Sequence, residues 1–378
     1  MGIQVPFVDL RAQYRQLKVE IDAAIATVLE EAAFVRGKYV EAFEQAYAKA
    51  HGVRHCIGVG NGTDALYVAL RALGVGPGDE VLVPALTWIS TAETVSHLGA
   101  RPVFVDIEPD YYTLDPCHAE HCVTERTRVI IPVHLYGQPA DMEKLLNLAR
   151  RYSLIVLEDC AQAHFAQYHG QLIGTFGTIA AFSFYPSKNL GAYGDAGAIL
   201  TNDDALAHFI RIFTNHGSLT KYEHEIEGIN SRLDGLQAAI LSVKLRYIHQ
   251  WNRQRAEHAQ LYSELLADVE EITLPHIRPG CTHVFHLFVI RTPRRDELQH
   301  YLTSQGIQTQ VHYPRALPFV PAYRRFGHHP DEFPVAWQYQ HELLSLPLYP
   351  ELTETQIRYV AEHLKAFFVH QRPRIVRP

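Results

Sequence analysis

The sequence lacks the long hydrophobic runs that mark membrane proteins. Nowhere among its 378 residues do about 18 apolar residues follow one another, so no membrane-spanning helix is predicted. The first residues turn polar within a few positions and have no signal-peptide core, and Pro6 stands where a myristoylation motif requires serine or threonine. Five scattered cysteines, an odd number, do not form the framework of a small secreted domain. We therefore expect a cytoplasmic protein with no membrane partner.

An excess of positive charge is also missing. Lys and Arg number 34 against 41 Asp and Glu, and the formal net charge of -7 disfavours a sequence-independent grip on nucleic acid phosphates. The composition, 47% hydrophobic and 20% charged, is ordinary for a globular enzyme. The length is sufficient for two domains. Nucleic acid is therefore not an expected partner.

Short apolar segments rich in Val and Ile alternate with helical patterns over the first two thirds of the chain. This alternation predicts an α/β domain whose strands are buried on both faces. From about residue 235 a long helical pattern leads to a Pro/Gly break at 275–280, and strand, helix and strand patterns follow at 283–291, 296–306 and 307–313. We expect a large domain over residues 1–250 and a smaller C-terminal α/β domain over 251–378, bridged by the long helix.

A glycine-rich turn, GVGNG at 58–62, lies between the strand-like HCIGV and the helix-like TDALYVALRALG. Backbone N–H groups and the helix dipole at such a turn favour an anion, typically a phosphate. A dinucleotide-binding fold would also need an acidic residue at the end of the next strand, but VLVP ends without one. The turn therefore indicates phosphate, with a plain strand-to-helix connection as the alternative.

Two further polar positions follow apolar strands. Glu158 and Asp159 end LIVLED, where a carboxylate needs a cation such as a protonated pyridine nitrogen, unless Asp159 only caps the next turn. Lys188 follows TIAAFSF among glycines, and a desolvated lysine is a nucleophile for aldehydes, although most lysines are simply exposed. Pyridoxal 5'-phosphate (PLP) carries a phosphate, a pyridine nitrogen and an aldehyde. The three features together indicate PLP.

The chain resembles the DegT/DnrJ/EryC1/StrS family of PLP-dependent nucleotide-sugar aminotransferases. The resemblance covers almost the full length and is carried by blocks such as NGTDALYVALRALGVGPGDEVLVP, EDCAQAH, FSFYPSKNLGAYGDAGAILTND, NSRLDGLQAA, HYP and LSLPLYPELT. It implies an α/β PLP-dependent transferase of the aspartate aminotransferase fold (fold type I), with a large, mostly parallel sheet domain and a smaller C-terminal α/β domain. The implied cofactor is PLP and its amino form.

The resemblance also implies roles for single residues. Lys188 resembles the lysine that bonds to PLP and shuttles protons, and Asp159 the partner of the pyridinium nitrogen. Gln162 resembles the donor to the cofactor's phenolic oxygen, and Trp88 the ring that stacks on the pyridine. The implied phosphate ligands are Gly62, Thr63 and Ser183, with Asn230 supplied by a neighbouring subunit. This last match implies a homodimer with shared active sites.

A second set of residues matches segments that line the sugar-nucleotide side in the family. For each of them simple surface polarity is the alternative. The implied substrate-binding residues are His216, Tyr222, His224, His312 and Tyr313.

A departure from the family pattern and two possible metal-binding clusters also have to be interpreted. Phe165 stands where many relatives have glycine, and it either narrows the cofactor space or fills a core hole. Lys188 argues against the branch that has histidine there and removes a sugar hydroxyl. The cluster CHAEHC at 117–122 lacks the ligand spacing of a structural zinc site, and the pair His51 and His55 lacks the HExxH glutamate. We expect no metal.

The expected reaction is transamination of a nucleotide-linked keto sugar, with an amino acid, L-glutamate, as donor, in deoxyamino sugar biosynthesis. The segments near the sugar resemble enzymes acting on dTDP-linked 3-keto-6-deoxyhexoses, and less closely those using UDP-linked 3-keto sugars. A 4-keto sugar remains an alternative. From other classes, an NAD-dependent sugar-nucleotide oxidoreductase or epimerase and a PLP-bound regulator without turnover also remain open.

Overall fold

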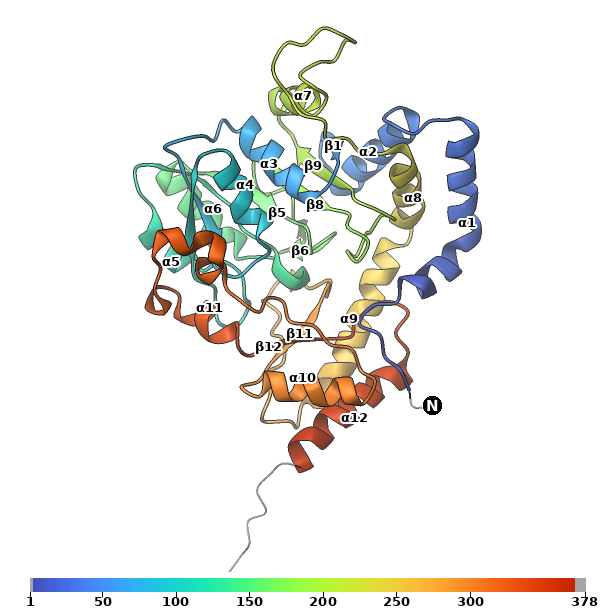
Figure 1. Ribbon diagram of the computed structural model, residues 1–378, viewed down its shortest axis with the longest axis vertical. Coiled ribbons are helices and arrows are strands. Elements are labelled where there is room, and N and C mark those ends of the chain that lie inside the picture. Colours follow the sequence, from blue (N-terminus) through green and yellow to red (C-terminus); the bar gives the residue numbers. More distant parts are fainter. Residues whose placement is uncertain (1–2, 371–378) are drawn as a thin grey trace, which may run out of the picture.

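A seven-stranded sheet forms the centre of the larger part of the molecule (Figure 1) in the computed structural model, which describes residues 3–370. The strand order is β1-β9-β8-β5-β4-β2-β3. Only β9 runs antiparallel to its neighbours, so the predicted mostly parallel sheet is confirmed. The strands are β1 (His55–Val59), β2 (Glu80–Pro84), β3 (Arg101–Val105), β4 (Thr127–Ile130), β5 (Ile155–Asp159), β8 (Ile179–Ser183) and β9 (Gly197–Thr201).

Both faces of this sheet are buried, which explains why its strands read as continuous apolar runs. In β8, Ile179 and Ala181 pack into one core, whereas Ala180 and Phe182 pack into another. Helices cover the two faces (Figure 1). The helices of this part are α1 (Leu10–Glu30), α2 (Lys38–His51), α3 (Gly62–Ala72), α4 (Ser90–His97), α5 (Pro116–Cys122), α6 (Met142–Tyr152), α7 (Asp204–Phe213) and α8 (Gly235–Leu245), with the 3-10 turn η1 (Leu135–Gly137).

The smaller part has its own core below the sheet in Figure 1. Two antiparallel strands, β11 (Phe288–Arg291) and β12 (Leu343–Leu346), pack with the helices α9 (Ile248–Leu266), α10 (Arg295–Ser304) and α12 (Glu354–His370). The remaining elements are β6 (Gln167–Tyr168), β7 (Gln171–Leu172), β10 (Cys281–Thr282), η2 (Leu317–Phe319), η3 (Pro321–Phe326), η4 (Pro330–Glu332) and α11 (Pro334–Tyr339). No helix within residues 3–370 has the length and apolarity to cross a membrane.

Two sequence-based expectations about this region are wrong. The bridging helix is broken between α8 and α9, where Glu20 of α1 accepts hydrogen bonds from Arg246 and Tyr247. The segment 307–313 is no regular strand, because it makes only isolated pairs, including Gln310 with Ser345, and the second strand of the small sheet is β12 instead. The predicted domain boundary at residue 250 falls inside α9 and stays a prediction.

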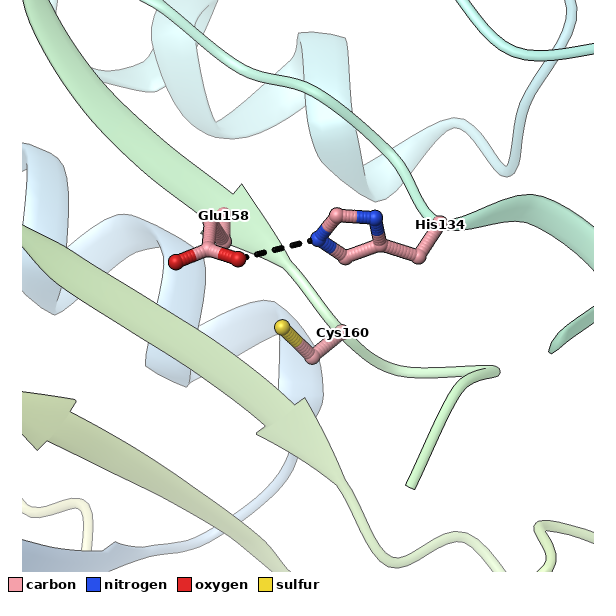
Figure 2. Close-up of side chains that lie close together, drawn as sticks. All are labelled: His134, Glu158 and Cys160. Atoms are coloured by element: carbon pink, nitrogen blue, oxygen red, sulfur yellow. Dashed lines mark hydrogen bonds and ion pairs between the residues drawn. The ribbon is translucent and has the colours of Figure 1, made fainter. Parts of the chain in front are cut away.

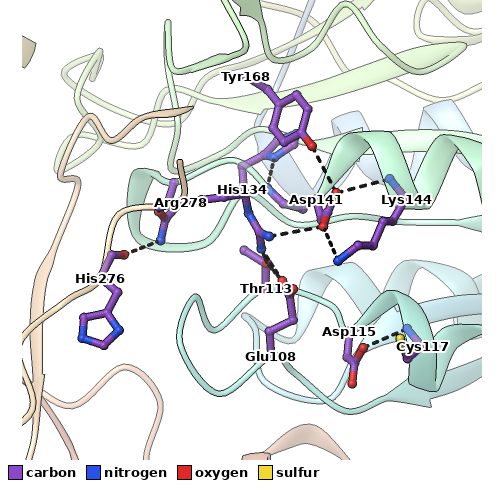
Figure 3. Close-up of polar contacts among 12 residues, drawn as sticks. Glu108, Thr113, Asp115, Cys117, His134, Asp141, Lys144, Tyr168, His276 and Arg278 are labelled. Carbon is purple, nitrogen blue, oxygen red and sulfur yellow. Dashed lines mark hydrogen bonds and ion pairs between the residues drawn. The ribbon is translucent and has the colours of Figure 1, made fainter. Parts of the chain in front are cut away.

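A buried arginine ties the segment between the two parts to the large sheet domain (Figure 3). Arg278 lies in the Pro/Gly break and bonds to Glu108, which follows β3, and to Asp141 Oδ2 at 3.3 Å. Asp141 also accepts a hydrogen bond from the Tyr168 hydroxyl at 3.1 Å. Charge-assisted bonds of this kind, made inside the protein, hold geometry strongly. They fix the segment around Arg278 relative to the carboxyl edge of the sheet.

Candidate active site

The carboxyl ends of the strands meet around one cavity of about 420 Å³. Residues after β1, β2, β5 and β8 line it from the large part, and residues near β11 and after α10 line it from the smaller part. This is the edge at which open α/β sheets bind ligands. Nine predicted site residues line the cavity together: Gly62, Thr63, Trp88, Asp159, Gln162, Ser183, Lys188, His312 and Tyr313.

One end of the cavity is built as an anion site. Asn61 caps α3 by accepting the N–H of Asp64 at 2.8 Å. Within residues 3–370, the N–H groups of Gly62 and Thr63 have no hydrogen-bond acceptor. These first-turn donors and the helix dipole favour a phosphate.

The glycine at the start of α3 is required by close packing. A Cβ atom built on Gly62 would lie 2.6 Å from Cβ of Ser183 at the end of β8. Across the same contact, a Cβ atom on Gly197 would lie 2.4 Å from the carbonyl oxygen of Asn61. Glycine therefore lets the start of α3 and the end of β8 approach each other, so that both reach the same anion.

Asp159 presents a buried carboxylate to the cavity from the end of β5. Oδ2 accepts a hydrogen bond from the Thr91 hydroxyl at 3.0 Å, and Oδ1 accepts one from the N–H of Ala161 at 3.2 Å. Burial raises the pKa of Asp159, and these bonds and the ammonium of Lys188 partly offset that rise. Such a carboxylate is suited to a cation that enters the cavity.

Lys188 reaches the cavity from the loop after β8. Its backbone N–H bonds to the carbonyl of Tyr185 at 2.8 Å, and Ala192 N–H bonds to Phe184 at 2.7 Å, so the loop folds back on itself. A Cβ atom on Gly191 would lie 2.3 Å from the carbonyl oxygen of Pro186. Burial lowers the pKa of Lys188 to about 8. A neutral amine is thus available near physiological pH.

Gln162, Tyr313 and Trp88 form the side of the cavity between the two parts. Gln162 Oε1 accepts the N–H of Tyr136 at 2.6 Å, and Nε2 donates to the Tyr313 hydroxyl at 3.0 Å. The second Nε2 hydrogen remains for a ligand. The Trp88 ring, 58% exposed, lies 5.9 Å from that of Tyr313. These two rings offer stacking surfaces to a flat ligand.

Glu158, one residue before Asp159, has a different role (Figure 2). Its carboxylate accepts the N–H groups of Gly174 at 2.7 Å and Gly177 at 2.7 Å. It also pairs with His134 Nε2 at 3.1 Å. Cys160 lies beside the pair. Among residues 3–370, these three side chains are the ones of metal-binding type whose potential ligand atoms lie close together. Because the carboxylate is already fully bonded, we interpret the trio as structural support for the end of β5.

Comparisons with known proteins identify the family of the chain. The model of the DegT/DnrJ/EryC1/StrS aminotransferase family covers residues 15–365. The chain belongs to this family. It is therefore a PLP-dependent aminotransferase of the predicted fold, and the NAD-dependent alternative is set aside.

Two relatives and one solved structure illustrate the similarity to this aminotransferase family. A "pleiotropic regulatory protein" of Geobacillus stearothermophilus is 48% identical over 97% of this chain and 100% of its own length. A dTDP-3-amino-3,4,6-trideoxy-alpha-D-glucose transaminase of Streptomyces venezuelae is 46% identical over 96% of each chain. The crystal structure of S. venezuelae DesV in complex with a ketimine intermediate has 46% identity and a TM-score of 0.94, covering 96% of this chain and 98% of that chain.

The residues of this aminotransferase fit PLP at each functional group of the cofactor. The free N–H groups at the start of α3 suit the phosphate, and the Asp159 carboxylate suits the protonated ring nitrogen. The Lys188 amine suits the aldehyde, and the remaining Gln162 hydrogen suits the phenolic oxygen. No predicted cofactor residue that lines the cavity conflicts with this arrangement.

Four predicted residues of the aminotransferase lie outside the cavity wall: His216, Tyr222, His224 and Asn230. They belong to the loop after α7, which projects at the top of Figure 1. The loop is closed by pairing of Asn215 with Asn230, and Tyr222 is 81% exposed. Within one chain the structure therefore does not bring these residues to the other nine.

The structure also gives clear positions to Phe165 and to the Cys/His cluster at 117–122 of the aminotransferase. Phe165 has a φ of 64° and packs its ring on His51 and His249, so it fills the core and leaves the cavity unchanged. A left-handed φ explains why glycine suits this position. In the CHAEHC cluster, His118 Nδ1 accepts the N–H of Asp106. The N–H of Cys117 donates to the carboxylate of Asp115, just before the cluster (Figure 3).

Sequence reasoning missed several cavity residues of this aminotransferase. Tyr185, Ser187 and Asp195 lie within the block that carried Lys188, and their proximity to the lysine was the available signal. His286 comes from the smaller part, in HVFHLFVIR, where it reads as one polar residue in an apolar strand. Nothing local in that pattern distinguishes it from an ordinary buried histidine.

Proposed function

We propose that this protein transfers an amino group from L-glutamate to a dTDP-linked 3-keto-6-deoxyhexose in deoxyamino sugar biosynthesis. The observation that carries the proposal is the cavity that gathers Lys188, Asp159 and the N-terminus of α3. The name of the S. venezuelae transaminase specifies a dTDP sugar with its amino group at C3, which supports the choice of sugar. The donor rests on the family resemblance alone.

The side chains divide the work of this reaction. PLP, when bound, supplies an aldehyde that condenses with amines and a ring that accepts electrons. Burial lowers the pKa of Lys188 to about 8, so a neutral amine is available that would bond to the aldehyde of PLP and could accept and donate protons in the cavity. The Asp159 carboxylate would hold the protonated ring nitrogen by charge pairing, and the free N–H groups at the start of α3 would hold the phosphate.

The sugar side of the cavity is assigned to His312 and Tyr313. Both line the cavity next to Lys188, and burial lowers the pKa of His312 to about 4, so it is a neutral hydrogen-bonding group. His312 Nδ1 bonds to Ser345 at 2.8 Å, which orients the ring. Neutral imidazole and phenol groups suit the hydroxyls and carbonyl of a sugar.

We further propose a homodimer with shared active sites. Asn230, the phosphate ligand that the family resemblance assigns to a neighbouring subunit, is exposed and lies outside the cavity of its own chain, which supports a role in the site of a second copy. The projecting loop exposes Leu219 and Tyr222, and Phe34 and Val35 are exposed as well. Exposed apolar side chains of this kind support an interface between subunits. The same loop would bring His216, His224 and Lys221 toward the substrate of the partner.

A cytoplasmic location completes the proposal. All five cysteines are free, which suits a reducing compartment.

The test is a half-reaction with the enzyme loaded as pyridoxamine phosphate. dTDP-linked 3-keto, UDP-linked 3-keto and 4-keto sugars are offered separately, and the return of visible absorbance at about 410–430 nm is followed. We expect the fastest return with the dTDP-linked 3-keto sugar. A response to a 4-keto sugar alone would contradict amination at C3. No response to any sugar would favour the regulatory role that the name of the Geobacillus relative suggests.

A further inference from the structure

His286 is a buried histidine on the wall of the cavity. It is 8% exposed and lies just before β11, in the smaller part, while Lys188 lies on the opposite part of the same wall. The predicted site residues do not include it, and the proposed reaction has not yet used it. Its hydrogen-bonding state is nevertheless determined by its neighbours.

The partner that determines it is Asn189, the residue after Lys188. Asn189 Nδ2 donates to Asn252 Oδ1 at 2.9 Å and to the carbonyl oxygen of Val284 at 2.9 Å, which uses both of its hydrogens. The Oδ1 atom, an acceptor only, therefore faces His286 Nδ1 at 3.2 Å. Nδ1 of His286 must carry the hydrogen of this bond.

The ring is also neutral. Burial lowers the pKa of His286 well below its usual range, and the positive charges of Lys188 and Arg255 lower it further. The other titratable groups around it are His164 and His312, both of which burial keeps neutral. A neutral ring protonated at Nδ1 has a lone pair on Nε2, and the hydrogen bond that the ring makes among residues 3–370 is the one from Nδ1 to Asn189.

Lys188 has the complementary requirement. Its ε-amine has no hydrogen-bond acceptor among the residues that the structure describes, and its ionised neighbour is Asp159. A lysine has rotatable bonds along its stem, so an amine without an acceptor points in several directions. The asparagine that orients His286 is bonded through the backbone to this lysine, so movements of the two are coupled.

We propose that His286 is a positioning residue for Lys188: Nε2 accepts a hydrogen bond from the ε-amine whenever that amine is not bonded to the cofactor, and so holds it in the cavity. The inference rests on the proposed role of Lys188. It assigns to Asn189 the task of keeping the histidine in the tautomer that can accept. It gives the smaller part of the chain a direct influence on the reactive group of the larger part.

The test measures the proton affinity of the Lys188 amine in the cofactor-free protein. The rate of its acetylation by acetic anhydride is followed against pH, with the Lys188 peptide quantified by mass spectrometry. An acceptor stabilises the ammonium form, so His286→Phe should lower the proton affinity about tenfold. His286→Gln, which retains an acceptor, should stay within about threefold of the wild type.

The matched control is His283→Phe. His283 is also 8% exposed and neutral, lies on the same segment and does not line the cavity. Wild-type titration of Lys188 in His286→Phe, or an equal change in His283→Phe, would overturn the proposal. If His286→Phe does not fold, nitrogen NMR of the wild-type imidazole decides: hydrogen on Nδ1 agrees, and hydrogen on Nε2 contradicts. Because no cofactor is present, the result is independent of where PLP attaches.

Discussion

At the scale of single residues, reactivity in this site comes from burial. The Lys188 amine and the Asp159 carboxylate both lose solvent, which lowers the pKa of the first to about 8 and raises the pKa of the second. Each is then adjusted by one or two specific contacts, such as the Thr91 hydroxyl on Asp159. The sequence places the two residues after apolar strands, but only the fold determines how far water is excluded from them.

Two variants at the Asp159 carboxylate should lose activity to different degrees. Asp159→Asn removes the charge that stabilises a protonated ring nitrogen, and we expect turnover to fall by about 10²–10³-fold, with weaker PLP binding. Thr91→Val removes one hydrogen bond from a neutral donor but leaves the charge of the same carboxylate in place, and we expect a loss of only about 2–10-fold. Steady-state kinetics and PLP titration measure both effects. Equal losses in the two variants would show that the charge of Asp159 is not what matters.

At the scale of elements, the lysine loop is held from behind by α8. Lys244 is fully buried, donates to the carbonyl oxygen of Gly191 at 2.7 Å and lies 4.1 Å from the Tyr193 ring centre. Burial lowers the pKa of Lys244 to about 7. A helix thereby supports, through one side chain, the loop that presents Lys188.

This buried lysine predicts a dependence of stability on pH. Between pH 7 and 10.5 the unfolded chain keeps the Lys244 proton while the folded chain has lost it, so stability rises with pH across that window. Urea unfolding of the cofactor-free protein should show a slope up to about 1.4 kcal/mol per pH unit steeper for the wild type than for Lys244→Met. The exposed variant Lys49→Met should run parallel to the wild type. Parallel profiles for the wild type and Lys244→Met would refute the lowered pKa of Lys244.

Some helices and strands could be predicted from the sequence and others could not. Strands buried on both faces read as apolar runs, so the main sheet and the polar residues at its strand ends were predictable. The break at Tyr247 was not, because no Gly or Pro marks it and a contact from distant α1 holds it. The segment 307–313 alternates in polarity like a strand. The strand beside it, β12, pairs mainly with β11 and makes only an isolated pair with this segment. His286 was missed because its role depends on Asn189, far away in sequence.

At the scale of the whole molecule, the proposed site needs two chains. The cavity of one chain contains Lys188 and lacks Asn230, which lies on the projecting loop after α7. We predict that Lys188→Ala and Asn230→Ala, each inactive or weak alone, regain activity when mixed under conditions that exchange subunits. One of the two sites in each hybrid dimer then contains both wild-type residues. Random exchange makes about half of the dimers hybrids, so recovery should reach about a quarter of wild-type activity. No recovery, with hybrids confirmed by native mass spectrometry, would contradict a shared site.

Lys188 is proposed as the lysine that bonds to PLP, and chemical trapping identifies the lysine that carries the cofactor. The protein loaded with PLP is reduced with borohydride, digested, and the peptide carrying the pyridoxyl group is sequenced by mass spectrometry. Lys244 is a built-in competitor, because it is also buried and burial lowers its pKa to about 7. We expect the pyridoxyl group on Lys188 of the wild-type protein and none in Lys188→Ala. A pyridoxyl group on Lys244 or another lysine of the wild-type protein would contradict it.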